Sequence, residues 1–563
     1  MAFGILEDRH YPDGNVPGTA LLDDHEHTGV RDEVVDGLKK GSGRYSHIVL
    51  VPQPSDDPND PLNWPRWKKE AIFWTLSFMA GLVGAIGPLL APGYSVLAAE
   101  WGVSVNEVAA TNGDLVIALG CIMIVQAPLG VKFGRRPVFL VGAALLFFCT
   151  IWSAESKNIT SFKWSRVFQG LGMAPFEALV VSTIGDIFFV HERGFRSAIW
   201  GFAILAGINI TPIVNGYVIE SDKLGYRWCF WLIAIFLGIA FLGIIFLCPE
   251  TAYNRESIYD TSSGRSLEGV SAVNKASEEL EKENSHEPKP TGQIEHLEGG
   301  PRAINSFGPR KTWVQELAPI SSYRGKASLL KTIIRPFPFF LSPAVWFGIF
   351  TYGMTTCWLV VLSIISSILF ASPPYFFNAS QTGLVSIGPL VASIPATLIA
   401  GPLCDMSATY FARRNGGRFE PEFRLFLMLP MFILEVFGFM GWSLMTKNQS
   451  IPWIGPVFMY SLINAGQSIG STCIITYLID VHSKHTPEAI SIINLFKNLV
   501  LYGFTQFAVN WVLEQGIPGT MGVLAGLSAV CILTTVPMYI YGKRIRSYVA
   551  RHEKLYLAVD EKL

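Results

Sequence analysis

Long apolar stretches recur along almost the whole chain, and they limit the folds that it can adopt. A helix that crosses the hydrocarbon core of a membrane needs about 20 mostly apolar residues. In lipid, every backbone N–H and C=O group must be paired within the protein, which a helix achieves by itself. The sequence therefore predicts an all-α integral membrane protein with twelve transmembrane helices. The first six are Ala71–Pro92, Ala110–Gly130, Pro137–Ala154, Trp164–Phe188, Ala198–Ile219 and Cys229–Cys248; the second six are Ala344–Phe370, Gly383–Leu403, Leu425–Met445, Pro452–Leu478, Ala489–Val512 and Thr520–Tyr541.

A polar segment divides the predicted helices into two sets of six. Its central part, Ser271–Arg302, mixes charges of both signs with Ser, Pro and Gly and contains no aromatic residue. Such a segment cannot bury enough apolar surface to offset the entropy of ordering it, so we expect a largely disordered linker. The predicted organisation is a cytoplasmic N-terminal tail (1–70), an N-terminal six-helix bundle (71–248), a cytoplasmic linker (249–340), a C-terminal six-helix bundle (341–542) and a cytoplasmic C-terminal tail (543–563).

The distribution of basic residues predicts the orientation of the helices. Cytoplasmic loops of membrane proteins carry an excess of Lys and Arg. In this chain the loops on the side of the N-terminus are the more basic ones, and the even number of helices brings the basic C-terminal tail to the same side. We therefore expect both tails to be cytoplasmic. The expected location is the plasma membrane, with a vacuolar or other internal membrane as the alternative.

Two short turns occupy matching places in the two sets of helices. The first, within "APLGVKFGRR", joins helices 2 and 3, where Gly134 allows a tight reversal and Lys132, Arg135 and Arg136 face the cytoplasm. The second, "GPLCDMSATYFARRNGG", ends helix 8 and contains Asp405. Related turns in two six-helix sets are typical of a duplicated transporter with two pseudo-symmetric halves.

These motifs resemble those of the major facilitator superfamily over nearly the whole chain. "APLGVKFGRR" is similar to that family's helix 2–3 signature, with Val131 where the family has Asp. "RVFQGLGMAP" is similar to the helix 4 signature, and "GFAILAGINITPIVNG" to the helix 5 antiporter signature, here carried by Gly207, Pro212 and Gly216. The flanks "SDDPNDPLNW", "PETAYNR" and "NGGRFEPEFRL" resemble fungal members of the drug:proton antiporter-like branch.

The resemblance implies functions for several of these segments. In the family, the acid of the helix 2–3 turn belongs to a charge cluster that holds the outward-facing state, so we expect a gating turn formed by Lys132, Gly134, Arg135 and Arg136, with Asp405 in the second half. Helix 4 lines the central cavity of the family, and polar residues of helices 7 and 10 complete its lining. The resulting cavity candidates are Gln169, Thr351, Tyr352, Thr355, Asn464 and Gln467, each of which could equally serve helix packing.

Charged residues within the predicted helices are the candidates for proton coupling or substrate binding. A charge at the centre of a bilayer costs at least about 2.5–3.5 kcal/mol, so its presence needs a reason. The candidates are Glu177, Arg166, Asp114, Lys497 and Glu435.

Helix 4 carries two of these charges on one helical face, and Glu177 lies about 16 Å from the cytoplasmic end, near the midplane. Glu177 could bind a proton or a cationic substrate, or form a structural hydrogen bond. Asp114 could be an entry site or a hydrated interfacial residue. Glu435 could be functional or could pair with a neighbouring helix, and Lys497 could extend to the surface or pair with an acid across the two halves.

The motifs that are missing exclude other classes of protein. The sequence has no G-x4-G-K-[ST] loop for ATP and no H-E-x-x-H zinc motif, and its net charge of −1 does not suggest a nucleic-acid partner. We expect no cofactor, no metal and no enzymatic activity; the expected partners are a small organic molecule, protons and membrane lipid.

The leading hypothesis is a proton-coupled secondary transporter that exports a small organic molecule such as a drug, toxin or secondary metabolite. Proton-coupled uptake of an organic cation such as a polyamine is the first alternative. A membrane nutrient sensor that does not transport is the second.

Overall fold

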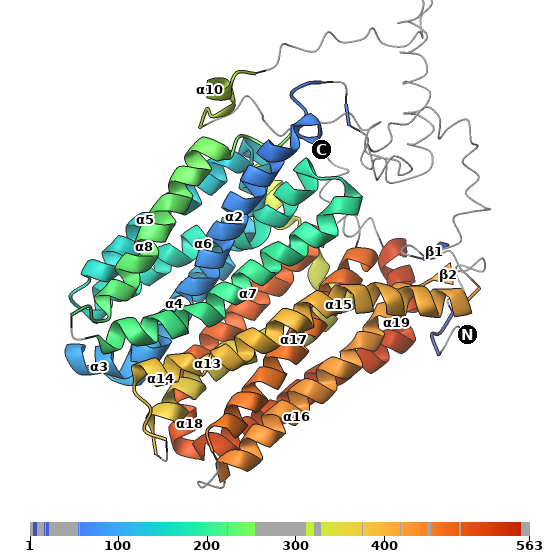
Figure 1. Cartoon of the computed structure of the whole chain (residues 1–563). Helices are drawn as coiled ribbons and strands as arrows, with labels where there is room; N and C mark the ends of the chain where they lie inside the picture. Colours follow the sequence, from blue (N-terminus) through green and yellow to red (C-terminus); the bar gives the residue numbers. More distant parts are fainter. Residues whose placement is uncertain are drawn as a thin grey trace, which may run out of the picture.

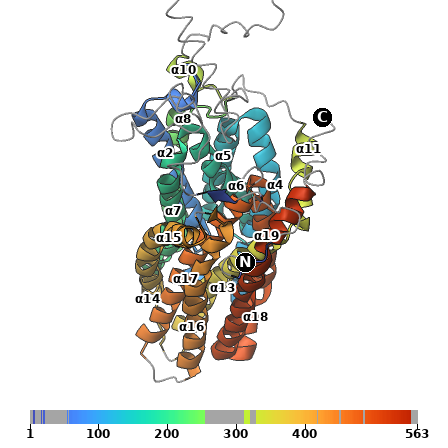
Figure 2. The same ribbon diagram turned by 90° about the vertical axis from the view of Figure 1, so that its right-hand side faces the viewer.

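The computed structural model describes residues 57–221, 223–253, 311–319, 328–373, 375–416, 418–447, 452–482 and 486–552, together with 4–7, 16, 19–21, 54 and 55. The described residues are mostly helical, and the long helices form two bundles that lie side by side (Figures 1 and 2). The predicted disordered stretch Ser271–Arg302 lies outside the described residues.

The described part of the N-terminal half contains six long helices and three short ones. Helix α3 ends at Gly102, whose φ of 65° is left-handed, and α4 begins after Ser104, whose hydroxyl accepts the N–H of Glu107 at 3.2 Å. The elements are η2 (Pro61–Asn63), α2 (Arg66–Ile86), η3 (Ala91–Gly93), α3 (Tyr94–Trp101), α4 (Val105–Phe133), α5 (Arg135–Glu155), α6 (Ile159–Ile187), α7 (Val190–Glu220) and α8 (Arg227–Leu247).

The C-terminal half repeats this arrangement after the linker. Its first spanning helix is interrupted by a π-helical stretch, η6. The elements are α12 (Pro343–Gly348), η6 (Ile349–Met354), α13 (Thr355–Ala371), α14 (Ala379–Leu384), α15 (Ile387–Arg414), η7 (Pro421–Leu427), α16 (Met428–Lys447), α17 (Ile454–Val481), α18 (Thr486–Leu533) and α19 (Thr535–Arg551); the linker contributes α10 (Trp313–Glu316), α11 (Leu329–Ile334) and η5 (Phe337–Leu341). Strands β1 (Ala20–Leu21) and β2 (Arg418–Phe419) form a small antiparallel pair.

The number of membrane crossings agrees with the twelve helices predicted. Eleven helical segments of the described chain are long and apolar enough to span a membrane, and the last of them, Glu488–Arg551, has 64 residues. At 1.5 Å per residue that segment would measure about 96 Å, roughly three times the thickness of a hydrocarbon core. Gly516, with φ 71° and ψ 160°, breaks the helix, so the segment makes two crossings. The fold is therefore an all-α membrane fold with six helices in each half.

Close helix packing within the N-terminal half depends on glycines. A Cβ atom added at Gly170 of α6 would lie 2.1 Å from the backbone oxygen of Leu115 on α4, and one added at Gly207 of α7 would lie 2.0 Å from that of Gly81 on α2. Small residues at these positions allow the helix backbones to approach. Gly207, predicted as part of the helix 5 signature, therefore holds α7 against α2.

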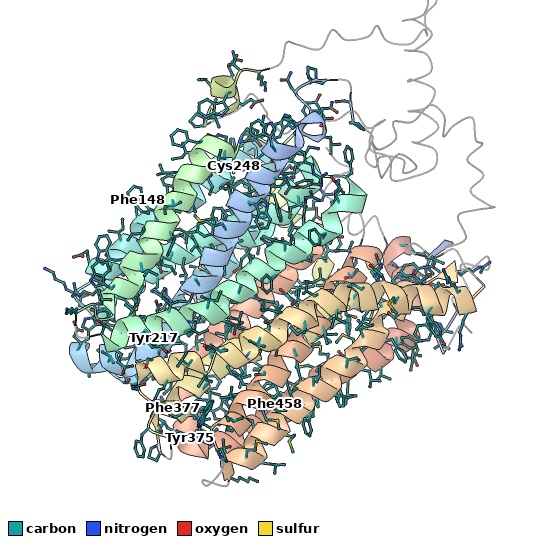
Figure 3. All side chains as sticks on the ribbon, in the orientation of Figure 1. Phe148, Tyr217, Cys248, Tyr375, Phe377 and Phe458 are labelled. Carbon is teal, nitrogen blue, oxygen red and sulfur yellow. The ribbon has the colours of Figure 1, made fainter. Side chains whose placement is uncertain are left out.

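The two halves contact each other at one end of the molecule and along α4 and α18, where a Cβ atom added at Gly120 would lie 2.7 Å from that of Asn498. Following the orientation predicted from the sequence, the end that carries α3 and α14 is called the outer end, and the end that carries Gly134 the cytoplasmic end. At the outer end Asn106 of α4 donates to the carbonyl of Gln506 on α18 at 2.9 Å, and Glu220 of α7 accepts the side-chain N–H of Asn378 at 2.7 Å. Figure 3 labels Tyr217 and Phe377, one from each half, at this end.

Candidate functional site

The interface between the halves contains a pair of opposite charges. Glu177 lies on α6 of the N-terminal half and Lys497 on α18 of the C-terminal half, and both side chains are half-buried. The Lys497 ammonium lies within electrostatic range of the Glu177 carboxylate and of Tyr352. The structure thus brings together three residues that the sequence singled out separately, and it places an acid opposite Lys497 across the two halves.

The π-helix η6 shapes the surroundings of Lys497. A Cβ atom added at Gly353 would lie 3.6 Å from the Cβ of Lys497, an ordinary van der Waals distance, so η6 and α18 pack against each other here. The thiol of Cys357 contacts the carbonyl oxygen of Lys497 at 3.2 Å. Short π-helical stretches within α-helices are frequent at functional sites. Here the stretch contains Thr351 and Tyr352, two of the predicted cavity residues.

Gln467 of α17 adds an unused hydrogen-bond acceptor to the C-terminal half. Its Nε2 donates to the hydroxyl of Thr356 at 2.8 Å, and that hydroxyl donates to the carbonyl of Tyr352 at 2.6 Å. The Oε1 atom of Gln467 is buried and has no hydrogen-bond partner among the residues that the structure describes. A buried acceptor without a partner is unfavourable. A ligand whose N–H or O–H group donates to this oxygen would remove that cost.

The other cavity candidates of the C-terminal half use their polar groups within their own helices. The hydroxyl of Thr351 donates to the carbonyl of Phe347, that of Thr355 to the carbonyl of Thr351, and the amide of Asn464 to the carbonyl of Tyr460. All three candidates are almost fully buried. Their arrangement corresponds to the packing alternative that the sequence left open.

Arg166 and Gln169 lie inside the N-terminal half. The guanidinium of Arg166 donates to Gln169 Oε1 at 3.1 Å, to the carbonyl of Ile86 at 3.1 Å and to Asn112 Oδ1 at 3.2 Å. Asp114 is half-buried and close enough to interact electrostatically with Arg166. Neutral acceptors from α2, α4 and α6 therefore hold the charge of Arg166, as in a structural network that joins three helices.

Glu435 lies within the C-terminal half. Its side chain is 1% exposed, and both carboxylate oxygens lack a hydrogen-bond partner among the described residues. It packs from α16 against Gly466 of α17 and interacts with Cys531 of α18. Glu435 is thus enclosed by helices of one half.

The cytoplasmic turn of the N-terminal half is built around a carboxylate that the sequence analysis did not select. Glu250 accepts the backbone N–H groups of Arg135 at 2.8 Å and Arg136 at 3.2 Å, and so caps the N-terminus of α5. Burial raises the pKa of Glu250, and the backbone hydrogen bonds that it accepts partly offset the rise. Arg135 also forms an ion pair with Asp186 of α6. Glu250 and Asp186 thus supply acids at a turn where Val131 replaces the family's Asp.

The side chain of Arg136 ties this turn to neighbouring segments. Arg136 donates to the carbonyls of Ile245 at 2.9 Å and Leu317 at 2.9 Å, which links the end of α8 to the linker after α10. Lys132 lies half-buried at the end of α4. The motif "PETAYNR" directly after helix 6 was the available signal for Glu250, but its contact with a turn 114 residues earlier is not visible in the sequence.

The matching turn of the C-terminal half is organised by one arginine. Arg424 of η7 contacts Asp405 Oδ1 at 2.8 Å and Asp480 Oδ2 at 2.6 Å. Asp405 is largely exposed, whereas Asp480 at the end of α17 is more enclosed. Neither Arg424 nor Asp480 was among the functional residues predicted from the sequence.

The helix 5 signature forms part of the outer contact between the halves. A Cβ atom added at Gly383 of α14 would lie 2.2 Å from the backbone oxygen of Pro212 on α7, and one added at Gly216 would lie 2.5 Å from that of Ala379. The backbones of α7 and α14 therefore touch only because both positions are glycines. Pro212 and Gly216 therefore lie in the contact between the two halves at the outer end.

The cytoplasmic turn gives a prediction about stability. We expect Gly134→Ala to lower thermal stability in detergent by more than Gly102→Ala. Both glycines have positive φ, 96° and 65°, and such strain costs of order 1–3 kcal/mol for other residues. Only at Gly134 would the new Cβ also meet Glu250, 2.1 Å from Oε2, whereas nothing lies within 4 Å at Gly102. Equal melting temperatures for the two variants would show that the Glu250 cap tolerates displacement.

Comparisons with known proteins identify related sequences. A family model described as "Major Facilitator Superfamily" matches residues 73–503. The chain is 24% identical over 580 residues to "Protein HOL1" of Saccharomyces cerevisiae, covering 96% of this chain and 97% of that protein. It is 28% identical over 511 residues to "MFS transporter cpaT" of Aspergillus oryzae, covering 87% and 90%.

Solved structures share the fold. A crystal structure of a D-xylose-proton symporter superimposes with a TM-score of 0.54 at 14% identity, covering 83% of this chain and 97% of that one. A crystal structure of the peptide transporter POT in complex with sulfate gives a TM-score of 0.53 at 15% identity, covering 92% and 98%.

Proposed function

The chain belongs to the Major Facilitator Superfamily of transporters, and from this premise we propose that it is a proton-coupled carrier that exports a small organic molecule. Transport would proceed by rocking of the two halves about a site between them. The observation that supports proton coupling is the proximity of Glu177 and Lys497 across the interface. We further propose the drug:proton antiporter-like branch, as its sequence motifs suggest.

A single carboxylate between the halves can couple protons to a cation by competition. A proton on Glu177 removes the charge that would attract a cationic group, so the residue can bind one or the other. Lys497 supplies the counter-charge when the Glu177 carboxylate has bound neither a proton nor a cation. Because loading with one ligand requires release of the other, the two ligands move in opposite directions. Where protons enter the cell, an organic molecule with a basic group would leave it.

Uptake of an organic cation such as a polyamine is the second candidate. The half-buried Glu177 would attract a cation from either side of the membrane. A membrane potential that is negative inside draws cations inward by about 2.3 kcal/mol per charge at 100 mV. Export and uptake thus depend on the same residue and differ in whether protons move against the substrate or with it.

The sign of the pH gradient tests these proposals in proteoliposomes. If the protein is an exchanger, vesicles with an acidic interior are expected to accumulate ethidium or spermidine from a neutral medium, because protons leave as substrate enters. A proton symporter would accumulate the probe when the medium is the acidic side. Binding of a probe without movement under either gradient would contradict the carrier proposal and favour the sensor.

In cells the direction of transport can be read from accumulation. Deletion of an exporter is expected to raise the internal level of the probe, and deletion of an uptake carrier to lower it. A strain that expresses Glu177→Gln serves as the control, because it keeps the protein while changing the proposed proton site. A lower internal level of the probe in the deletion strain would contradict export.

A further inference from the structure

The beginning of the chain lies on the far half of the molecule. Residues 4–7, 16 and 19–21, called here the N-terminal latch, contact the cytoplasmic end of the C-terminal half although they precede the N-terminal half in sequence. Ile5 is 0% exposed and packs with Ala412 of α15 and Phe423 of η7. An apolar anchor of this kind is typical of peptide docking.

Polar contacts fix the first part of the latch beside α19. The backbone N–H of Leu6 donates to the carbonyl of Ile540 at 3.0 Å. The carboxylate of Glu7 pairs with Lys543 Nζ at 2.7 Å, and Arg544 Nε donates to the carbonyl of Glu7 at 3.2 Å. One apolar side chain and one acidic side chain, two residues apart, therefore each have a matching partner on the surface.

The second part of the latch adds a strand to the turn after α15. Ala20 and Leu21 of β1 pair antiparallel with Phe419 and Arg418 of β2. The hydroxyl of Thr19 donates to Glu420 Oε2 at 2.8 Å. Addition of a strand to an exposed edge is a recurrent mode of peptide recognition, in which the backbone supplies affinity and side chains supply specificity. Figure 1 shows β1 and β2 together at the cytoplasmic end of α15.

The charged residues of the C-terminal half beneath the latch form ion pairs with one another. Arg546 pairs with Glu420 at 2.6 Å and with Glu422 at 2.8 Å, and Lys543 pairs with Glu420 at 2.8 Å. If the latch left the surface, Lys543 would lose its contact with Glu7 but keep the one with Glu420. The buried charges of the C-terminal half would therefore stay paired. The latch can therefore detach without leaving an uncompensated buried ion.

The latch is attached to the N-terminal half by the chain that follows it. Residues before α2 are anchored there, since Asp57 accepts the hydroxyl of Tyr253 at 2.8 Å and Lys69 donates to the carbonyl of Leu62 at 2.8 Å. Residues 22–53 join the two attachments, and a chain of that length can extend to about 100 Å. The connecting chain is thus long enough to let the latch leave the C-terminal half. The contacts between the latch and that surface must therefore hold it in place.

We propose that the N-terminal latch is a reversible intramolecular ligand that favours the conformation with a closed outer end. The latch covers the cytoplasmic end of α15, whose half contacts α7 at the outer end through Gly383 and Pro212. When the halves rock, opening of the outer end brings the cytoplasmic ends together. A peptide seated at the cytoplasmic end opposes that closure, and a ligand shifts the equilibrium by its preference for one state. The inference rests on the alternating movement of the halves, not on the substrate or on proton coupling.

The test compares changes in the latch within one labelling background, so that the surface that binds the latch keeps its sequence. Thr382 is 8% exposed beside the outer contact, and Thr382→Cys provides a site for labelling from outside with an impermeant maleimide. In this background we expect Ile5→Asp with Glu7→Lys to raise the labelling rate at least about twofold and to speed trypsin cleavage after Arg9. Ile5→Val with Glu7→Asp, the matched control, is expected to behave like the parent.

A synthetic peptide of residues 1–21 provides the second measurement. It is expected to bind the full chain lacking residues 2–21 and to return its labelling rate to that of the parent, whereas the peptide with Ile5→Asp and Glu7→Lys is not. Unchanged labelling and cleavage in the latch variant, or a truncated protein that does not bind the parent peptide, would overturn the inference. Both measurements work without transport, so they remain decisive if the proposed substrate or proton coupling is wrong.

Discussion

Glu177→Gln is expected to abolish most transport driven by a pH gradient while leaving exchange of substrate at equal pH measurable. Gln keeps the size and polarity of the side chain but cannot exchange a proton. Coupling between two ligands of a protein typically amounts to about 5–150-fold, so we expect gradient-driven transport to fall by about tenfold or more. The measurement is the initial rate of probe accumulation in proteoliposomes with an imposed gradient, compared with counterflow in its absence.

The controls separate the interface from carboxylates elsewhere. Glu435→Gln removes a carboxyl that is enclosed within one half, and it should leave the dependence on the gradient intact. Lys497→Gln removes the counter-charge opposite Glu177, so its effect should be smaller when Glu177→Gln is already present. Full gradient-driven transport by Glu177→Gln would contradict the proton role. Additive effects of the two changes would show that the two residues act independently.

The helices could be predicted because hydrophobic length is a local property. Each predicted stretch corresponds to a helix, and even the merged segment Glu488–Arg551 divides at Gly516, between the last two predicted helices. The helical interruption η6 could not be predicted, since Ile349–Met354 has the composition of an ordinary membrane helix. The stretch packs against α18 near Lys497, a contact that the local sequence does not indicate.

The candidate site could be predicted only in part, because spacing along one helix does not reveal what the helix faces. Arg166 and Glu177 share a face of α6, but Arg166 is enclosed by α2 and α4 whereas Glu177 is exposed to the other half. The depth of Lys497 was visible in the sequence, but its partner depends on the relative position of two separately folded halves. The contacts of Glu250 and of Ile5 join residues more than 100 positions apart, and no local pattern indicates them.

Disruption of the outer contact between α7 and α14 is also expected to cause a large loss of transport. Gly383→Ala is the smallest change that should disrupt this contact. The added Cβ would lie 2.2 Å from the backbone oxygen of Pro212, a distance that real structures do not tolerate. Since the clash is between the halves, each half can still fold and the outer end can relieve the clash by staying open. A carrier that cannot close its outer end cannot complete its cycle. We expect transport to fall by about tenfold or more, the size of effect that coupled conformational equilibria produce.

A matched glycine distinguishes this mechanism from a general effect of alanine. Gly401 of α15 has nothing within 4 Å of an added Cβ, so Gly401→Ala should transport at the parent rate. Labelling of Thr382→Cys from outside should become faster with Gly383→Ala, because the residue is buried only while the outer end is closed. The melting temperature should stay near that of the parent. If Gly383→Ala transports normally, the glycine contact of α7 and α14 does not form during the cycle, and another pair of surfaces must close the outer end.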